Sequence, residues 1–142
     1  MKASKLRLFH QLQLAAHRLG KAADREVTDV SGLTTAQSAV LSVLANFDDV
    51  TQKKVATELG LNESAVTAMV TRLLRLDLIT RERSPDDPRR YILHMTKKGE
   101  QALAKIKVPF RKLNKRIETV LSPDEIDVLA RCLVQLNDEF SE

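Results

Sequence analysis

The sequence of 142 residues has one cysteine, no tryptophan and only 4% aromatic residues. A single cysteine, Cys132, excludes an intrachain disulfide and a zinc site built from several cysteines. We expect Cys132 to be a small buried hydrophobic residue of the last helix. The four glycines are scattered, so no glycine-rich loop is present to hold a phosphate. The histidines His10, His17 and His94 have no further metal ligand close to them in the sequence, so we expect no metal site. The sequence shows no combination of nucleophile and base, so we expect neither an enzyme nor a cofactor.

Long apolar runs are absent as well. No stretch approaches the roughly 18 apolar residues of a membrane span, and residues 1–20 interrupt their apolar positions with arginine, histidine and glutamine, unlike a signal peptide. These features predict a cytoplasmic protein with no membrane partner. The length suits a single domain, residues 1–142, with a core of ordinary size.

Charge is distributed unevenly along the chain, whose formal net charge is +4. Between Arg72 and Lys98 there are eight basic residues against four acidic ones, whereas Arg131 is the only base from Glu118 to the end. A local excess of cations suits a polyanionic partner. One part of the molecule is therefore suited to the phosphates of a nucleic acid, and another part is not.

Apolar residues recur every three or four positions in six segments, which predicts six helices. The first covers Ser4–Glu26 and is followed by a connection at Val27–Gly32. The segments Leu78–Arg83 and Arg90–Met95 flank turn-forming residues, which predicts a β-hairpin. The fold class is thus mainly α with one small hairpin (α+β). The other predicted helices follow the capping residues Thr34, Thr51, Asn62, Thr96 and Ser122 and end near Asn46, Gly60, Leu76, Val120 and Phe140.

Three residues in the third and fourth predicted helices have the spacing of a helix-turn-helix. Ala56 is small enough for two helices to cross closely, Gly60 forms the turn, and Val66 packs the second helix on the first. This spacing alone does not indicate DNA binding, because it also occurs in ordinary helical hairpins. The basic-flanked β-hairpin that follows indicates the winged form, in which the second helix enters the major groove and the wing lies over the backbone or minor groove.

The sequence resembles the MarR (multiple antibiotic resistance regulator) family in three segments. These are GLTTAQSAVLSVLA at 32–45, VATELGLNESAVTAMVTRLLRLDLITRERS at 55–84, and the wing Asp87-Pro88-Arg89 followed by HMTKKGEQAL at 94–103. The resemblance implies a winged helix-turn-helix at 33–95 and dimerisation helices at 1–32 and 96–142. It also implies a homodimer that binds a pseudo-palindromic double-stranded operator, as a repressor released by a small aromatic or anionic effector.

Two alternatives remain open at this point. One is a winged helix that contacts only proteins, and the other is a regulator that senses redox state through the thiol of Cys132.

The sequence departs from the family pattern at four positions. Many members carry Arg where Ala68 stands. Asp77 replaces the usual Gly before the first wing strand, at a position where we expect a left-handed conformation. Ser38 replaces an aromatic residue in the region where relatives hold small ligands, for which the candidate residues here are Phe9, His17 and Ser38. Arg90 adds a second cation at the wing.

Three groups of residues are candidates for DNA contact. The outward face of the fourth helix is expected to touch bases and phosphates, although Arg72 and Arg75 could instead form structural ion pairs. In the wing, Arg89 is expected to enter the minor groove, held by Asp87 in a bidentate pair. The start of the third helix is expected to bind backbone phosphate. The candidates are Asn62, Ser64, Ala65, Thr67, Ala68, Thr71, Arg72 and Arg75 in the recognition helix, Arg81, Asp87, Arg89 and Arg90 in the wing, and Thr51, Gln52, Lys53 and Lys54 at the phosphate site.

Overall fold

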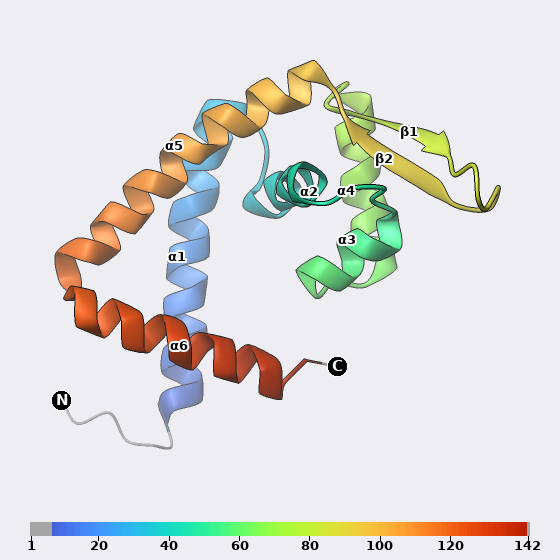
Figure 1. Ribbon diagram of the computed structural model, residues 1–142. Coiled ribbons are helices and arrows are strands. Elements are labelled where there is room, and N and C mark those ends of the chain that lie inside the picture. The colour runs from blue at the N-terminus through green and yellow to red at the C-terminus, as the bar shows by residue number, and fades with distance from the viewer. Residues whose placement is uncertain (1–6, 142) are drawn as a thin grey trace. The chain divides into compact units, whose positions relative to one another are not determined.

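The computed structural model describes residues 7–141 as six helices and one two-stranded antiparallel sheet (Figure 1). The prediction of a mainly α fold with a small hairpin is confirmed. The chain divides into two compact units, one extending to Pro109 and the other beginning at Phe110. The elements are α1 (Leu8–Ser31), α2 (Thr35–Asn46), α3 (Gln52–Leu59), α4 (Glu63–Arg75), β1 (Ile79–Arg83), β2 (Tyr91–Met95), α5 (Lys97–Val120) and α6 (Pro123–Glu139).

The helix starts follow from local hydrogen bonds that the sequence encodes. Before α2, the Thr34 hydroxyl accepts from the Gln37 backbone N–H at 3.1 Å, and the Gln37 side chain accepts from the Thr34 backbone N–H at 3.1 Å. Before α6, Ser122 and Glu125 form the same reciprocal box, with Pro123 in the first turn. Such boxes satisfy amide groups that have no partner within the helix. The predicted helix starts are confirmed at both places.

Helix α1 is longer than predicted at its C-terminal end. The expected connection at Val27–Gly32 is wrong, because α1 continues to Ser31 and ends at Gly32, whose φ of 71° is left-handed. Val27 is completely buried, and the Ser31 hydroxyl donates to its carbonyl oxygen at 2.6 Å. Burial of Val27 therefore outweighs the weak helix propensity of the surrounding residues. The first three positions of the predicted helix, residues 4–6, lie outside the described residues.

The core of the first unit lies where α2, α3 and α4 pack on one another and on the base of the hairpin. Its side chains are aliphatic, since none of the described residues larger than leucine or isoleucine is fully buried. Burial of these side chains supplies the main driving force for folding. The fully buried hydrophobic residues of this unit are Val27, Leu33, Val40, Leu41, Val50, Val55, Val66, Val70, Leu73, Ile79 and Ile106.

The hairpin is attached to the helices at its base, and its tip projects away from them (Figure 1). Its register pairs Ile79 with Met95 and Arg83 with Tyr91. The Leu93 backbone N–H donates to the Val50 carbonyl oxygen at 2.8 Å, which joins β2 to the loop between α2 and α3. The wing is therefore packed on the loop that leads into the helix-turn-helix.

The turn from α4 into β1 uses a left-handed residue, as predicted. Asp77 has a φ of 56°, a conformation that aspartate tolerates better than most residues. Its carbonyl oxygen accepts from the Thr96 hydroxyl at 2.6 Å. This hydrogen bond links the residue before α5 to the turn that follows α4.

In the second unit, α6 leaves its apolar side chains exposed in the single chain. No residue of α6 is buried. The expectation that Cys132 is buried is wrong, because it is exposed and lines a groove of about 480 Å³ with Leu121, Val128, Leu129 and two acidic residues. The predicted apolar face is present, but the chain does not cover it. No described helix is long and apolar enough to cross a membrane.

Candidate nucleic-acid interface

The predicted recognition helix α4 buries one face and exposes the other. Val66, Val70 and Leu73 are buried, as the 3.6-residue period requires, and Met69 is half-buried beside them. Asn62 caps the helix by accepting from the Ala65 backbone N–H at 2.8 Å. The candidate side chains on the other face are exposed, except that of Ala65, which is half-buried: Asn62, Ser64, Thr67, Ala68, Thr71, Arg72 and Arg75.

The helix-turn-helix core has the predicted geometry. Gly60 ends α3 with a φ of 63°, where a side chain would be strained. Ala56 is 8% exposed at the crossing, and its carbonyl oxygen accepts from the Leu61 backbone N–H at 3.0 Å. Val66 is completely buried. The small residue, the turn glycine and the β-branched residue therefore occupy the positions expected from their spacing.

Several hydroxyl groups on the outward face of α4 are already hydrogen-bonded within the protein. Ser64 donates to the Asn62 side chain at 2.8 Å, and Thr71 donates to the Thr67 carbonyl oxygen at 2.8 Å. The Thr67 hydroxyl donates to the Glu63 carbonyl oxygen at 2.9 Å. These bonds occupy the hydroxyl donors, so the groups remaining for a base are acceptor positions and methyl groups.

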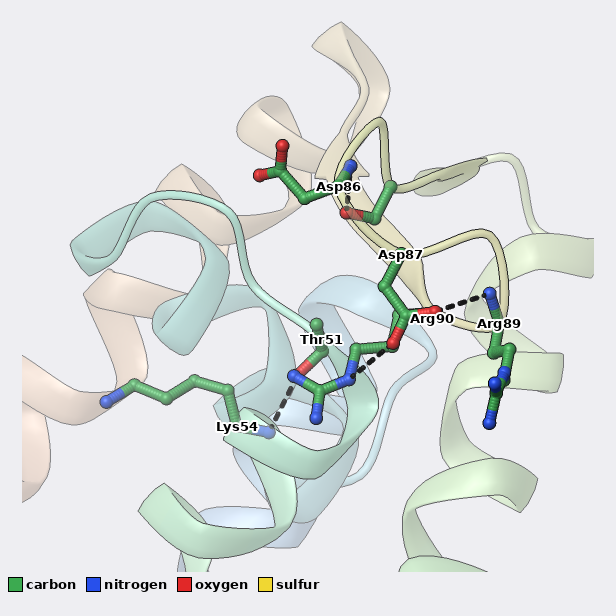
Figure 2. Close-up of polar contacts among 7 residues, drawn as sticks. Thr51, Lys54, Asp86, Asp87, Arg89 and Arg90 are labelled. Carbon is green, nitrogen blue, oxygen red and sulfur yellow. Dashed lines mark hydrogen bonds and ion pairs between the residues drawn. The ribbon is translucent and has the colours of Figure 1, made fainter.

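At the start of α3, the four phosphate candidates have different surroundings. The Thr51 hydroxyl accepts from the Lys54 backbone N–H at 3.2 Å, which uses one of the free amides of this terminus. The Lys54 ammonium forms an ion pair with Glu58 at 2.8 Å and lies 4.5 Å from the centre of the Phe47 ring. Figure 2 shows the Lys54 side chain extending away from the wing. Lys53 is exposed and has neither contact.

The tip of the wing is organised by Asp87, but not in the way predicted. Its carboxylate accepts from the backbone N–H of Arg89 at 3.0 Å and forms an ion pair with the Nε of Arg90 at 3.6 Å. The expected bidentate pair between Asp87 and the Arg89 guanidinium is therefore wrong. The carboxylate holds the turn closed through the backbone, and the neighbouring arginine takes the ion pair. The Arg89 guanidinium points away from Asp87 (Figure 2).

The wing and the helix-turn-helix share one groove of about 340 Å³. Its lining combines the start of α3 with Glu63 at the start of α4 and with the base of the tip. In Figure 2 the Arg90 guanidinium extends toward Thr51, whereas Arg89 extends in another direction. The groove is mainly cationic, and Glu63 is its one acidic residue. Its lining residues are Thr51, Gln52, Lys53, Glu63, Arg89, Arg90 and Tyr91.

The hairpin sorts its charged side chains between its two faces. On one face the Cζ atoms of Arg81 and Arg83 lie 5.0 and 5.9 Å from the centre of the Tyr91 ring. On the other face Glu82 and His94 are in contact, with Oε1 and Nε2 2.7 Å apart. The sequence interpretation included Arg81 but missed Arg83, Tyr91 and the groove residue Glu63. The alternation of a strand would have placed Arg83 beside Arg81, whereas Glu63 is brought to the groove only by the fold.

Comparison with known proteins identifies the family. The sequence model of the MarR family matches residues 31–90. The putative transcriptional regulatory protein for the hcr operon of Thauera aromatica is 34% identical over 118 residues, which are 83% of this chain and 71% of that protein. The HTH-type transcriptional regulator MgrA of Staphylococcus aureus is 32% identical over 138 residues, covering 97% of this chain and 92% of MgrA. The chain belongs to the MarR family.

Solved structures agree with this assignment to the MarR family. The transcriptional repressor CouR, bound to a 23-mer DNA duplex, has a TM-score of 0.86 at 32% identity, covering 96% of this chain and 97% of CouR. The PcaV transcriptional regulator of Streptomyces coelicolor, in complex with its natural ligand, has a TM-score of 0.79 at 28% identity, covering 97% and 98% of the two chains. The predicted winged helix-turn-helix regulator is therefore confirmed.

The predicted ligand-pocket residues of this MarR-family chain have unlike environments. Ser38 is 2% exposed, and its hydroxyl donates to the Thr35 carbonyl oxygen at 2.7 Å. Phe9 is 64% exposed, and His17 is also exposed, both on α1. The groove at α6 and the groove at the wing are lined by other residues. Within residues 7–141, no group of three or more histidine, cysteine, aspartate or glutamate residues is arranged to hold a metal ion.

Proposed function

We propose that this chain is a homodimeric transcriptional repressor that binds double-stranded DNA at a pseudo-palindromic operator. The observation that carries the proposal is the shared groove, in which the start of α3, the start of α4 and the base of the wing tip meet with Lys53, Arg89 and Arg90. Basic side chains and helix amides positioned together suit backbone phosphates. CouR, which is 32% identical, is a repressor whose structure contains a DNA duplex.

The proposed division of labour follows from exposure. The outward face of α4 would lie in the major groove and contact bases through Ser64, Ala65 and Thr67. The Arg89 guanidinium has no ion pair with Asp87, which bonds only the Arg89 backbone, and it would enter the adjacent minor groove. The remaining candidates would contact the sugar-phosphate backbone: Asn62, Ala68, Thr71, Arg72 and Arg75 in the recognition helix, Arg81 and Arg90 in the wing, and Thr51, Gln52, Lys53 and Lys54 at the start of α3.

Lys54 would take part in that set indirectly, because its backbone N–H donates to the Thr51 hydroxyl and so positions that residue. The Lys54 side chain is held by Glu58 and Phe47. Asp87, which would repel phosphate, acts in the proposal by closing the turn that presents Arg89.

Dimerisation would use residues 1–32 and 96–142. The exposed large apolar residues concentrate in these segments, where α1 exposes Leu8, Phe9 and Leu12, and α6 exposes Leu133 and Leu136. Exposed apolar helix faces of this kind are a common mark of association, and two-fold symmetric pairs are the commonest soluble oligomers. A symmetric pair would place two recognition helices on half-sites about 10 base pairs apart.

Release from DNA by a small aromatic or anionic effector is the regulatory part of the proposal. It is supported by PcaV, a similar protein whose structure contains its natural ligand. The residues proposed for this site are Phe9, His17 and Ser38, and the effector would shift the population between DNA-binding and released states. As a regulator the protein would act in the cytoplasm and would have no catalytic activity.

The test is selection of bound DNA fragments followed by an anisotropy titration at several salt concentrations. We expect an operator with two half-sites, bound by a dimer, whose log Kd rises linearly with log salt because bound phosphates release their counterions. A scrambled duplex of equal length is the control. Failure to select any sequence, or equal affinity for the scrambled duplex, would overturn the proposal and favour a winged helix that contacts only proteins.

A further inference from the structure

Strand β1 carries the run Arg81, Glu82 and Arg83, in which charge alternates with the period of a strand. Successive side chains of a strand point to opposite faces of the sheet. The register places Arg83 opposite Tyr91 and Thr80 opposite His94. The two arginines therefore share a face with the tyrosine, and the glutamate shares the other face with the histidine.

The side-chain geometry on each face agrees with this register. The guanidinium carbons of Arg81 and Arg83 lie 5.0 and 5.9 Å from the centre of the Tyr91 ring. An aromatic ring attracts cations within about 6 Å of its centre through its quadrupole. Neither arginine has an ion-pair partner among residues 7–141, and both are exposed. Their positive charge is thus oriented but not neutralised.

The acidic residue of the run does not offset this charge on the same face. Glu82 is in contact with His94 at 2.7 Å on the opposite face. A carboxylate beside the two guanidinium groups would bind them and repel a phosphate. Its placement leaves one face of the hairpin with two cations and an aromatic ring.

We infer that Tyr91 is a positioning residue, which holds Arg81 and Arg83 as a phosphate-binding surface of the wing that extends from the tip along β1. The ligand is the phosphodiester backbone of the operator. Tyr91 is 37% exposed and also lines the groove that contains Thr51 and Arg90. The surface thus continues from that groove along β1. This inference rests on the proposed DNA-binding function.

The test compares the variants Y91F and Y91L on the selected operator. Phenylalanine keeps the ring, and leucine keeps apolar bulk without it. We expect Y91L to weaken binding about five- to tenfold, because the ring no longer attracts the two guanidinium groups. Its log Kd should also depend less steeply on log salt, by up to about 0.9 for each phosphate that the wing no longer neutralises. Y91F should match the parent in both measurements.

Two further variants separate positioning from a general loss of structure. T80A alters an exposed residue of the same strand on the opposite face, and its affinity and salt slope should equal those of the parent. R81A should cost less in the Y91L background than in the parent, because the ring no longer orients that guanidinium. Melting temperature and dimer mass are recorded for every variant.

The outcomes distinguish this inference from the proposed function. If the parent binds the operator but Y91L binds equally well with an unchanged slope, Tyr91 positions nothing. If Y91F loses as much affinity as Y91L, the phenol hydroxyl and not the ring is responsible, and the inference is wrong. If the parent itself selects no operator, it is the proposed function that fails.

Discussion

The Gln52 side chain donates a hydrogen bond to the Thr67 hydroxyl oxygen, with Nε2 and Oγ1 3.1 Å apart. This hydrogen bond joins the first residue of α3 to the outward face of the recognition helix. The Thr67 hydroxyl in turn donates to the Glu63 carbonyl oxygen. The polar groups of two proposed DNA-contacting residues are therefore engaged with each other, and Thr67 offers a base mainly its methyl group.

We predict that T67V lowers operator affinity by about 1 kcal/mol, or roughly fivefold, because valine keeps a methyl group but removes the acceptor for Gln52. Q52A should produce a similar loss, and the double variant should lose little more than either single variant, since both remove the same bond. Anisotropy titrations at one salt concentration give the four affinities. Fully additive losses would show instead that the hydrogen bond between the two side chains contributes nothing to operator binding.

We predict that Arg89 contributes to operator binding but not to dimerisation. R89A should weaken operator binding about tenfold or more, which corresponds to ~1.4 kcal/mol, because a guanidinium at the hairpin tip is removed from the minor groove. R131A removes the same charge from α6, outside the winged helix-turn-helix, and serves as the control. Light scattering should give the same dimer mass for parent and R89A. Affinity equal to that of the parent would refute this role.

Local patterns predicted the elements well, because their signals lie within a few residues. The capping box at Thr34 and the left-handed turn at Asp77 depend only on neighbouring side chains and backbone. The wing tip was harder to predict. Asp87 is close in sequence to both Arg89 and Arg90, and the conformation of the turn determines which contact each one makes. The Asp87 carboxylate accepts from the Arg89 backbone N–H and forms its ion pair with Arg90.

Residues that meet only through the tertiary fold could not be predicted from spacing. Glu63 joins the groove because α4 crosses α3 near the wing, and no local pattern encodes that crossing. Cys132 shows that burial is also difficult to predict from spacing. Its helical position marks an apolar face, but whether that face is buried depends on what covers it, and the single chain leaves it exposed.

Asp24 gives the fold a predicted dependence on pH. The side chain and backbone N–H of Thr35 lower the pKa of Asp24 from its ordinary value of 3.8, and the carboxylate accepts from that N–H at 2.7 Å. Because the pKa is lowered in the folded state, ionised Asp24 stabilises the protein above pH 3.8, and this contribution is lost as the pH falls through the lowered value.

We therefore expect D24A to lower stability at neutral pH by roughly 1 kcal/mol or less, since the bond caps the start of α2 but the carboxylate is exposed to solvent. The difference in melting temperature between D24A and the parent should shrink on acidification below about pH 4. D29A, on an exposed position of the same helix, is the control. A difference that stays constant down to about pH 2 would contradict the assignment.

Gly99 is predicted to be essential for seating the start of α5 on the turn between α4 and β1. A Cβ atom there would lie 2.1 Å from the Leu78 carbonyl oxygen and 2.7 Å from the Met95 Cγ. The Leu78 carbonyl cannot move freely, because it accepts from the Thr96 backbone N–H at 3.0 Å. G99A should therefore destabilise the protein by about 1–3 kcal/mol or more, as overpacking does.

Gly20 provides the matched control for this variant. It lies inside α1, and a Cβ atom there would meet no atom within 4 Å. G20A should leave stability unchanged or raise it by about 0.5–1 kcal/mol, since alanine favours a helix interior. Thermal unfolding followed by circular dichroism compares the two variants. Equal melting temperatures for G99A and G20A would show that the close approach at Leu78 relaxes without cost.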